Sequence, residues 1–198
     1  MKMKLLVVAS VVLVQGGVAR AEIKTKEVSY QCKGVNLKGY FAWDDAVKGA
    51  RPGVLVVHEW WGLNDYAKKR AEQLAQLGYV AFAADMYGEG KNTNHPDDAR
   101  KMATEVRSNV EQWRQRALAA LDVLKSQPQC DKTKLAAIGY CFGGSTALQL
   151  AYAGADLSAG QGATNTCLSI TSADSGDKVA EYATARIDPL ASMSCKGL

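Results

Sequence analysis

The chain has 198 residues, enough for one domain with a hydrophobic core, and its 47% hydrophobic and 22% charged residues are typical of a globular protein. The net charge of +4 is small and no basic cluster is interleaved with aromatic residues, which argues against nucleic-acid binding. Two histidines and the absence of a Cys-x-x-Cys pair argue against a zinc site. We therefore predict no metal and no cofactor.

The N-terminus has the three parts of a secretory signal peptide. Two lysines open the chain, residues 5–14 form an apolar run, and residues 19–21 read Ala-Arg-Ala, a cleavage pattern. A buried N-terminal strand is the alternative, but it leaves the cleavage pattern unexplained. We predict a signal peptide over residues 1–21 and a mature chain from Glu22. The protein would then be exported, in a bacterial periplasm, without a membrane partner after removal of the signal.

Four strands and one helix are predicted between the signal peptide and residue 88. Residues 22–43 alternate between apolar and polar, which is typical of an antiparallel pair at a sheet edge. Residues 53–57 and 79–84 are continuous apolar runs, typical of strands buried on both faces. Between these two runs, Asn64 or Asp65 caps a helix that ends at Gly78.

The next part of the chain predicts two helices and another strand. One helix starts near Asp97, and a longer one carries Trp113 and later apolar residues at helical spacing, so we interpret Trp113 as a core residue. Residues 135–138 form a strand that leads directly into Gly-Tyr-Cys-Phe-Gly-Gly and a helix of small residues. Alternating strands and helices predict an α/β fold with a doubly wound, mainly parallel sheet.

The turn at residues 139–144 is the candidate catalytic element. A strand, a glycine-containing turn and a helix follow one another here, the arrangement that holds a nucleophile above a parallel sheet. Gly139 and Gly143 leave room where the strand and helix approach each other. Cys141 lies at the tip, where helix N–H groups stabilise negative charge. A small buried cysteine is the alternative, but the flanking strand and helix favour a nucleophile. The pattern differs from nucleotide-binding glycine loops.

With residues 58–62, His-Glu-Trp-Trp-Gly, and residues 84–87, Ala-Asp-Met-Tyr, this turn resembles the dienelactone hydrolase family of α/β-hydrolases over about residues 30–159. The resemblance implies hydrolysis of ester or lactone bonds in a small-molecule substrate. It implies a cysteine nucleophile and a glutamate that helps to convert the thiol into a thiolate. It also implies an oxyanion hole made by two backbone N–H groups. These residues correspond to Cys141 and Glu59, with the N–H groups of Trp60 and Phe142.

Other polar residues near the predicted site have simpler interpretations. Glu59 itself is either catalytic, as the resemblance implies, or a strand-end charge that pairs with a base such as Arg70. We interpret His58 as a packing residue beneath its loop and Asp85 as a residue that fixes a strand-end turn. The family substrate carries a carboxylate that arginines usually meet. We interpret the candidates Arg100 and Arg107 as solvated helix charges.

The chain departs from the family pattern after Ala159. In α/β-hydrolases the triad acid and histidine follow the nucleophile, but both histidines here, His58 and His95, precede Cys141. Residues 160–198 contain no apolar run, so we expect the C-terminal strands of the sheet to be missing and the strand before Cys141 to have an open edge. Residues 22–159 would form the hydrolase domain, followed by an atypical tail over 160–198. We expect this tail to come from out-of-frame translation or an early end, with a natural divergent tail as the weaker alternative. The downstream acids, which we assign no role, are Asp174, Asp177 and Asp188.

Two alternatives to a hydrolase stay open. The first is a catalytically inactive homologue that keeps the fold and serves as a remnant or binding module. The second is a thiol redox protein, which is weaker because Cys141 has no resolving cysteine nearby in the sequence. In an exported protein, Cys32 and Cys130 are candidates for a disulfide, although the sequence leaves their pairing open.

Overall fold

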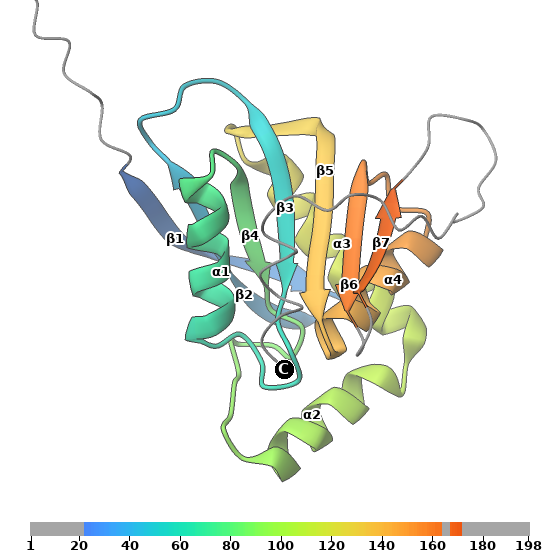
Figure 1. The fold of residues 1–198 in the computed structure, drawn as a ribbon. Coiled ribbons are helices and arrows are strands. Elements are labelled where there is room, and N and C mark those ends of the chain that lie inside the picture. Colours follow the sequence, from blue (N-terminus) through green and yellow to red (C-terminus); the bar gives the residue numbers. More distant parts are fainter. Residues whose placement is uncertain (1–21, 164–166, 172–198) are drawn as a thin grey trace, which may run out of the picture.

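The computed structural model describes residues 22–163 and 167–171 (Figure 1). The predicted signal peptide and residues 172–198, with their three aspartates, lie outside the described residues. The strands are β1 (Ile23–Cys32), β2 (Val35–Asp44), β3 (Arg51–Val57), β4 (Val80–Ala84), β5 (Cys130–Tyr140), β6 (Ala159–Ala163) and β7 (Cys167–Thr171). The helices are α1 (Asp65–Gln76), α2 (Pro96–Arg107), α3 (Val110–Ser126) and α4 (Phe142–Tyr152). Within this described part, none of the helices has the length and apolar character to span a membrane.

The strands form one sheet in the order β1-β2-β4-β3-β5-β6-β7. The central strand β3 runs parallel to both of its neighbours, β4 and β5, and β6 is parallel to β5. The N-terminal hairpin of β1 and β2 is antiparallel and joins the sheet through β4. The predicted α/β-hydrolase fold is therefore confirmed, and its sheet is mixed, with a parallel centre of β4, β3, β5 and β6.

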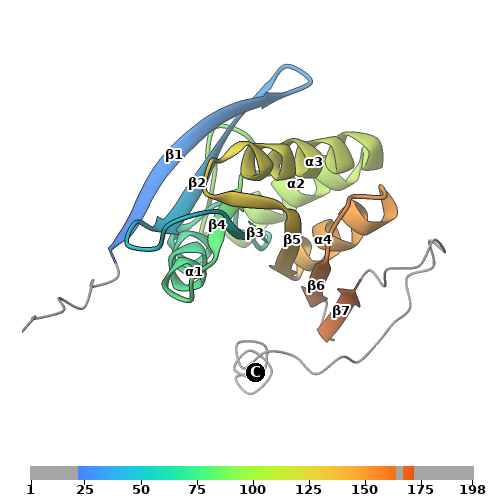
Figure 2. The ribbon, with the colours of Figure 1, turned by 90° about the horizontal axis from the view of Figure 1, so that it is seen from above.

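Helices cover both faces of the sheet, as Figure 2 shows. Along β3, Val54 and Val56 pack with the buried residues of α1, whereas Leu55 and Val57 pack in the larger cluster with α3 and α4. Successive side chains of a strand point to opposite faces, so the continuous apolar run at residues 53–57 serves two cores. Trp113 of α3 is buried in the larger cluster, as predicted.

The helix starts follow from their capping residues. The side chain of Asn64 accepts a hydrogen bond from the N–H of Ala67, which decides between the two predicted caps of α1. Gly78 follows that helix with φ +91°, as expected for a residue that ends a helix. The helix predicted from Asp97 begins one residue earlier, at Pro96, where a missing N–H costs nothing.

The sheet continues beyond Ala159, and the expectation of no strand there is wrong. Ala136 to Tyr140 pair with β6, so β6 covers the edge of β5 that was expected to be open. β7 then pairs antiparallel with β6. The sequence of β6, Ala-Gly-Gln-Gly-Ala, has no hydrophobic pattern, and backbone hydrogen bonds to β5 hold it in place.

Candidate active site

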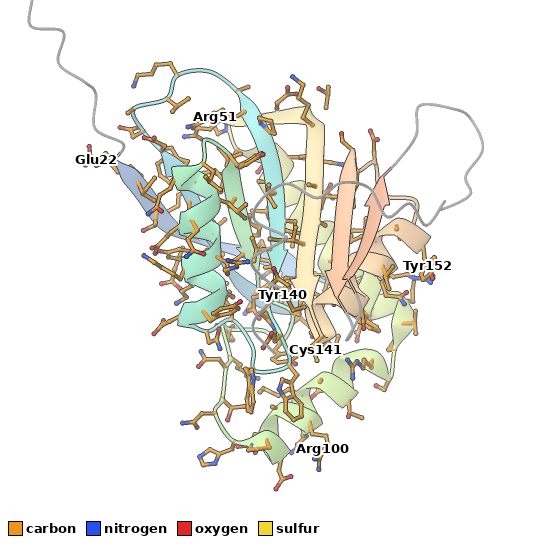
Figure 3. All side chains as sticks on the ribbon, viewed as in Figure 1. Glu22, Arg51, Arg100, Tyr140, Cys141 and Tyr152 are labelled. Carbon is orange, nitrogen blue, oxygen red and sulfur yellow. The ribbon has the colours of Figure 1, made fainter. Side chains whose placement is uncertain are left out.

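Cys141 lies at the tip of the turn between β5 and α4, at the carboxyl end of the parallel strands (Figure 3). Its backbone has φ 53° and ψ −115°, a conformation that a residue with a side chain adopts only under strain. The side chain is exposed, and the carbonyl oxygen accepts hydrogen bonds from the N–H and hydroxyl of Ser145. The turn therefore holds the thiol out at the first turn of a helix.

Two glycines allow this turn to be as tight as it is. A Cβ atom on Gly139 would overlap the backbone of Gly143. A Cβ atom on Gly143 would in turn overlap the carbonyl oxygens of Val57 and His58. The room that the sequence predicted at these glycines is thus occupied by neighbouring backbone. The same contacts press the start of α4 against the end of β3 and the loop that carries Glu59.

His58 packs beneath this loop and has no nitrogen free for chemistry. Its Nε2 accepts the N–H of Met86 at 3.2 Å, so Nδ1 carries the proton and donates to the carbonyl oxygen of Glu59. The ring stacks on Phe142, with centroids 5.7 Å apart, and meets Tyr87 edge-on. Burial lowers the pKa of His58 to about 4, which keeps the ring neutral at physiological pH. His58 is the packing residue that the sequence predicted.

Glu59 is half-buried at the end of β3. Burial raises the pKa of its carboxyl group above the ordinary value. Among the described residues no donor or cation contacts this carboxylate. The alternative partner Arg70 donates instead to Gln73 and to the hydroxyl of Tyr140. A carboxylate without a partner and with a raised pKa is a candidate proton acceptor.

The two residues whose N–H groups are expected to form an oxyanion hole, Trp60 and Phe142, each have a carbonyl oxygen that accepts a side-chain hydroxyl group. The carbonyl oxygen of Trp60 accepts the hydroxyl of Tyr87 at 2.9 Å. The carbonyl oxygen of Phe142 accepts the hydroxyl of Thr146 at 2.9 Å, and that hydroxyl accepts the indole N–H of Trp113. Within residues 22–163 and 167–171, neither the Trp60 nor the Phe142 N–H has an acceptor. These two N–H groups therefore have no partner within the described structure, and Phe142 is itself fully buried.

Two residues beside the elbow had no role assigned to them from the sequence, where Tyr87 appeared only within a family motif and Arg107 was interpreted as a solvated helix charge. Tyr87 is buried against Phe142, with ring centroids 5.4 Å apart, and burial raises the pKa of its hydroxyl group. Arg107, at the end of α2, has its guanidinium 5.3 Å from the centroid of the Phe142 ring. Arg107 therefore borders the elbow, whereas Arg100 is an exposed partner of Asp97. Arg107 lies far from Phe142 in the sequence, so no local sequence pattern predicts their contact.

Asp85 closes the turn after β4, as predicted. Its carboxylate is fully buried and accepts four backbone N–H groups at 2.8–3.0 Å. The donors are the N–H groups of Lys38, Tyr87, Gly88 and Gly90. All of its hydrogen-bonding capacity is engaged in holding the chain, so it has none left for chemistry.

The remaining thiols are distant from the elbow or outside the described side chains. Cys32 and Cys130 are free and buried, so the candidate disulfide between them is absent. Cys130 begins β5, whereas Cys141 follows the other end of that strand. In the described part of the chain, no three His, Cys, Asp or Glu side chains gather into a site that could hold a metal ion.

Known proteins that resemble this chain include dienelactone hydrolases and esterases. The profile of the dienelactone hydrolase family matches residues 37–169. The protein usf of Aquifex pyrophilus is 37% identical over 128 residues, which cover 63% of this chain and 54% of that protein. A dienelactone hydrolase-like promiscuous phosphotriesterase from metagenomic libraries is 43% identical, with a TM-score of 0.68 over 70% of this chain and 57% of its own. A cold-adapted esterase from an Arctic intertidal metagenomic library, 18% identical, shares the fold with a TM-score of 0.58 over 72% of this chain and 62% of its own. This chain thus spans little more than half the length of the first two relatives.

Proposed function

This chain belongs to the dienelactone hydrolase family, and on that premise we propose that it cleaves ester or lactone bonds of small molecules through a cysteine nucleophile, Cys141. The observation that carries this proposal is the strained backbone of an exposed cysteine at the start of a helix. Strain of this kind persists where the surrounding structure enforces it, and such places are commonly functional sites.

Acylation uses groups that have no other partner. The Glu59 carboxylate takes the thiol proton, and the thiolate sulfur attacks the carbonyl carbon of the substrate. The tetrahedral oxyanion is stabilised by the N–H groups of Trp60 and Phe142, each worth on the order of 3 kcal/mol in such sites. When the C–O bond breaks, protonated Glu59 returns its proton to the leaving alkoxide. The products of this half-reaction are an alcohol and a thioester on Cys141.

Deacylation needs a base that takes a proton from the attacking water. Glu59 is ionised again after acylation, and we assign this role to its carboxylate. The buried ring of His58 has both nitrogens engaged, and the sequence contains no histidine after Cys141. We therefore expect thioester hydrolysis to be slower than acylation in the 198-residue chain.

The second candidate is an inactive homologue that serves as a binding module. The observation that favours it is this lack of a histidine beside the thiol, because α/β-hydrolases use one to activate the nucleophile. The two candidates differ in one respect that can be measured. A hydrolase forms a thioester on Cys141, whereas a binding module leaves the thiol unmodified.

The test is a rapid-mixing experiment with p-nitrophenyl acetate and the full chain. We expect a burst close to one equivalent of p-nitrophenol and a matching acetyl adduct on the Cys141 peptide by mass spectrometry. Cys141→Ala should lower the burst rate by about a thousandfold or more. The matched control, Cys32→Ala, removes a buried thiol elsewhere and should leave the burst unchanged. A folded chain without a burst, or a burst that survives in Cys141→Ala, contradicts the proposal.

A further inference from the structure

His58 lies buried beneath the loop that carries Glu59 and Trp60, and the proposed acylation gives it no role. Its Nδ1 donates to the carbonyl oxygen of Glu59, which belongs to the same peptide group as the N–H of Trp60. This carbonyl oxygen also accepts the N–H of Gly62 at 3.3 Å, and His58 is the closer of the two donors. A peptide group is planar and this one is trans, so a hydrogen bond to its oxygen also fixes the direction of its N–H.

The other expected oxyanion-hole donor, the N–H of Phe142, is fixed in a different way. Its peptide group contains the carbonyl oxygen of Cys141, which accepts the N–H and the hydroxyl group of Ser145 within the first turn of α4. The N–H of Trp60 lies in a loop, where no helix turn holds its peptide group. Its orientation therefore depends on the side chain of His58.

His58 is itself one member of a series of hydrogen bonds that all run in the same direction. The hydroxyl group of Tyr30 donates to the carbonyl oxygen of Asp85 at 3.1 Å. The N–H of the same peptide group, that of Met86, donates to Nε2 of His58 at 3.2 Å. The ring then donates from Nδ1 to Glu59, and the series ends at the loop N–H, which has no acceptor in the described structure. Each bond in such a series polarises the next and strengthens it by about 10–30%.

The surroundings keep the imidazole in the tautomer that this series requires. Its ring stacks on Phe142 and meets Tyr87 edge-on, which restricts its rotation. Burial lowers the pKa of His58 to about 4, so the ring stays neutral and its Nε2 can accept the N–H of Met86. The hydroxyl group of Tyr30 keeps its proton, because burial raises its pKa as well.

We propose that His58 is a positioning residue of the oxyanion hole, which orients and polarises the peptide group between Glu59 and Trp60. This inference rests on the proposed acyl transfer through Cys141. His58 touches no substrate atom and exchanges no proton with the substrate. A polarised N–H interacts more strongly with a developing oxyanion than with a neutral carbonyl oxygen, so the effect belongs to the acylation rate and not to substrate affinity.

Two substitutions separate the roles of the two ring nitrogens. His58→Asn places an amide N–H near the position of Nδ1 and keeps a donor for Glu59, whereas His58→Gln reaches toward Nε2 and keeps an acceptor for Met86. We expect His58→Gln to lower the saturating acylation rate with p-nitrophenyl acetate by about three- to tenfold, with half-saturation unchanged. His58→Asn should recover most of that loss. A packing role predicts the reverse order, because asparagine leaves the larger cavity.

A second variant tests the remote end of the series without touching the imidazole. Tyr30→Phe removes the hydroxyl group but keeps the ring, and should lower the acylation rate by less than about threefold. Tyr40→Phe is the matched control, because the hydroxyl group of Tyr40 donates to Glu72 instead. It should leave the rate unchanged.

The ¹⁵N NMR signal of the Trp60 amide gives a measurement that does not depend on catalysis. This signal responds to hydrogen bonds at the preceding carbonyl oxygen, so it should move upfield in His58→Gln and stay in place in Tyr40→Phe. A parent chain that forms no acyl-enzyme contradicts the hydrolase proposal alone, and this signal then decides the role of His58. The positioning role is overturned by an unmoved signal, by an unchanged acylation rate in His58→Gln, or by a lower rate in His58→Asn than in His58→Gln.

Discussion

Two strand-end turns on the same edge of the sheet each carry a carboxylate, and the surroundings of the two carboxylates are opposite. Asp85, after β4, is fully buried and accepts four backbone N–H groups. Glu59, after β3, is half-buried, and none of the described residues donates to its carboxylate. Position at the carboxyl end of a parallel strand therefore does not distinguish a structural acid from a candidate catalytic one. The two carboxylates are distinguished by whether neighbouring N–H groups donate hydrogen bonds to them.

The turn that carries Cys141 differs from the Asp85 turn in its backbone as well. The Asp85 turn is stabilised by its own carboxylate, whereas the Cys141 turn is held in a strained conformation by the packing of Gly139 and Gly143. The first turn contributes stability through its hydrogen bonds. The second depends on the stability of its surroundings, and it is the one that presents the proposed nucleophile.

The largest effect is expected from Asp85→Ala, which leaves four buried N–H groups without their acceptor. We expect a loss of about 3–5 kcal/mol in the free energy of unfolding, measured by urea denaturation. Asp97→Ala is the matched control, because Asp97 pairs with Arg100 at an exposed site. Its effect should stay within about 0.5 kcal/mol. Equal losses in the two variants would show that the Asp85 turn is not a structural anchor.

Glu59→Gln should have the converse effect, lowering activity without lowering stability. The acylation rate should fall by about 10²–10³-fold, because the amide cannot accept the thiol proton. The pKa of Glu59 is raised by burial, so its ionised form costs stability above the folded-state pKa. The variant should therefore be at least as stable as the parent chain at pH 8, and the two should have the same Tm below about pH 4. A lower Tm at pH 8 would assign Glu59 a structural role.

His58 makes the junction of the two turns sensitive to acid. Its pKa is lowered to about 4 in the folded chain, against about 6.5 in an unfolded one. The contribution of neutral His58 is complete above about pH 6.5 and is lost as the pH falls toward 4, at about 1.4 kcal/mol per pH unit. His58→Gln keeps an acceptor for the N–H of Met86 but does not titrate. Urea denaturation between pH 7 and 4.5 should show a shallower decline for this variant than for the parent chain.

Arg107→Gln tests whether the border of the elbow selects anionic substrates, and its expected effect is the smallest. The guanidinium lies beside Phe142, so an ester with a carboxylate on its acyl group should lose about tenfold in kcat/KM, or in acylation rate where turnover is slow. An uncharged ester should lose less than about twofold. Arg100→Gln removes an arginine from the same helix without contact to the elbow. A similar loss for both substrates would exclude a role for Arg107 in charge recognition.

Much of the fold could be predicted from the sequence because the central strands carry a strong apolar signal. Residues 53–57 and 79–84 correspond closely to β3 and β4, which are buried on both faces. β5 was expected only over residues 135–138 but begins at Cys130. Cys130 and Asp131 are strand because Arg51 and Pro52 pair with them across the sheet, and the exposed polar residues 132–134 lie at the register shift that follows. Pairing between distant segments leaves no local pattern.

The candidate site was predictable where a residue has a local backbone requirement. Cys141 lies in a glycine-containing turn between a strand and a helix, and Glu59 ends a buried strand, so both stand out in the sequence. Tyr87 and Arg107 meet Phe142 only through tertiary packing. A single sequence carries no signal for such contacts.

The pairing of β3 with β5 also determines when Cys141 reaches its strained backbone conformation during folding. Val57 pairs with Gly139, so the two sides of the elbow come from segments far apart in the chain. Contacts of such long sequence separation form slowly, because loop closure must precede them. The tight approach of Gly143 to Val57 can arise only after this pairing. In a partly folded chain Cys141 is therefore not yet held in this turn, and a change in its alkylation rate would report completion of the central sheet.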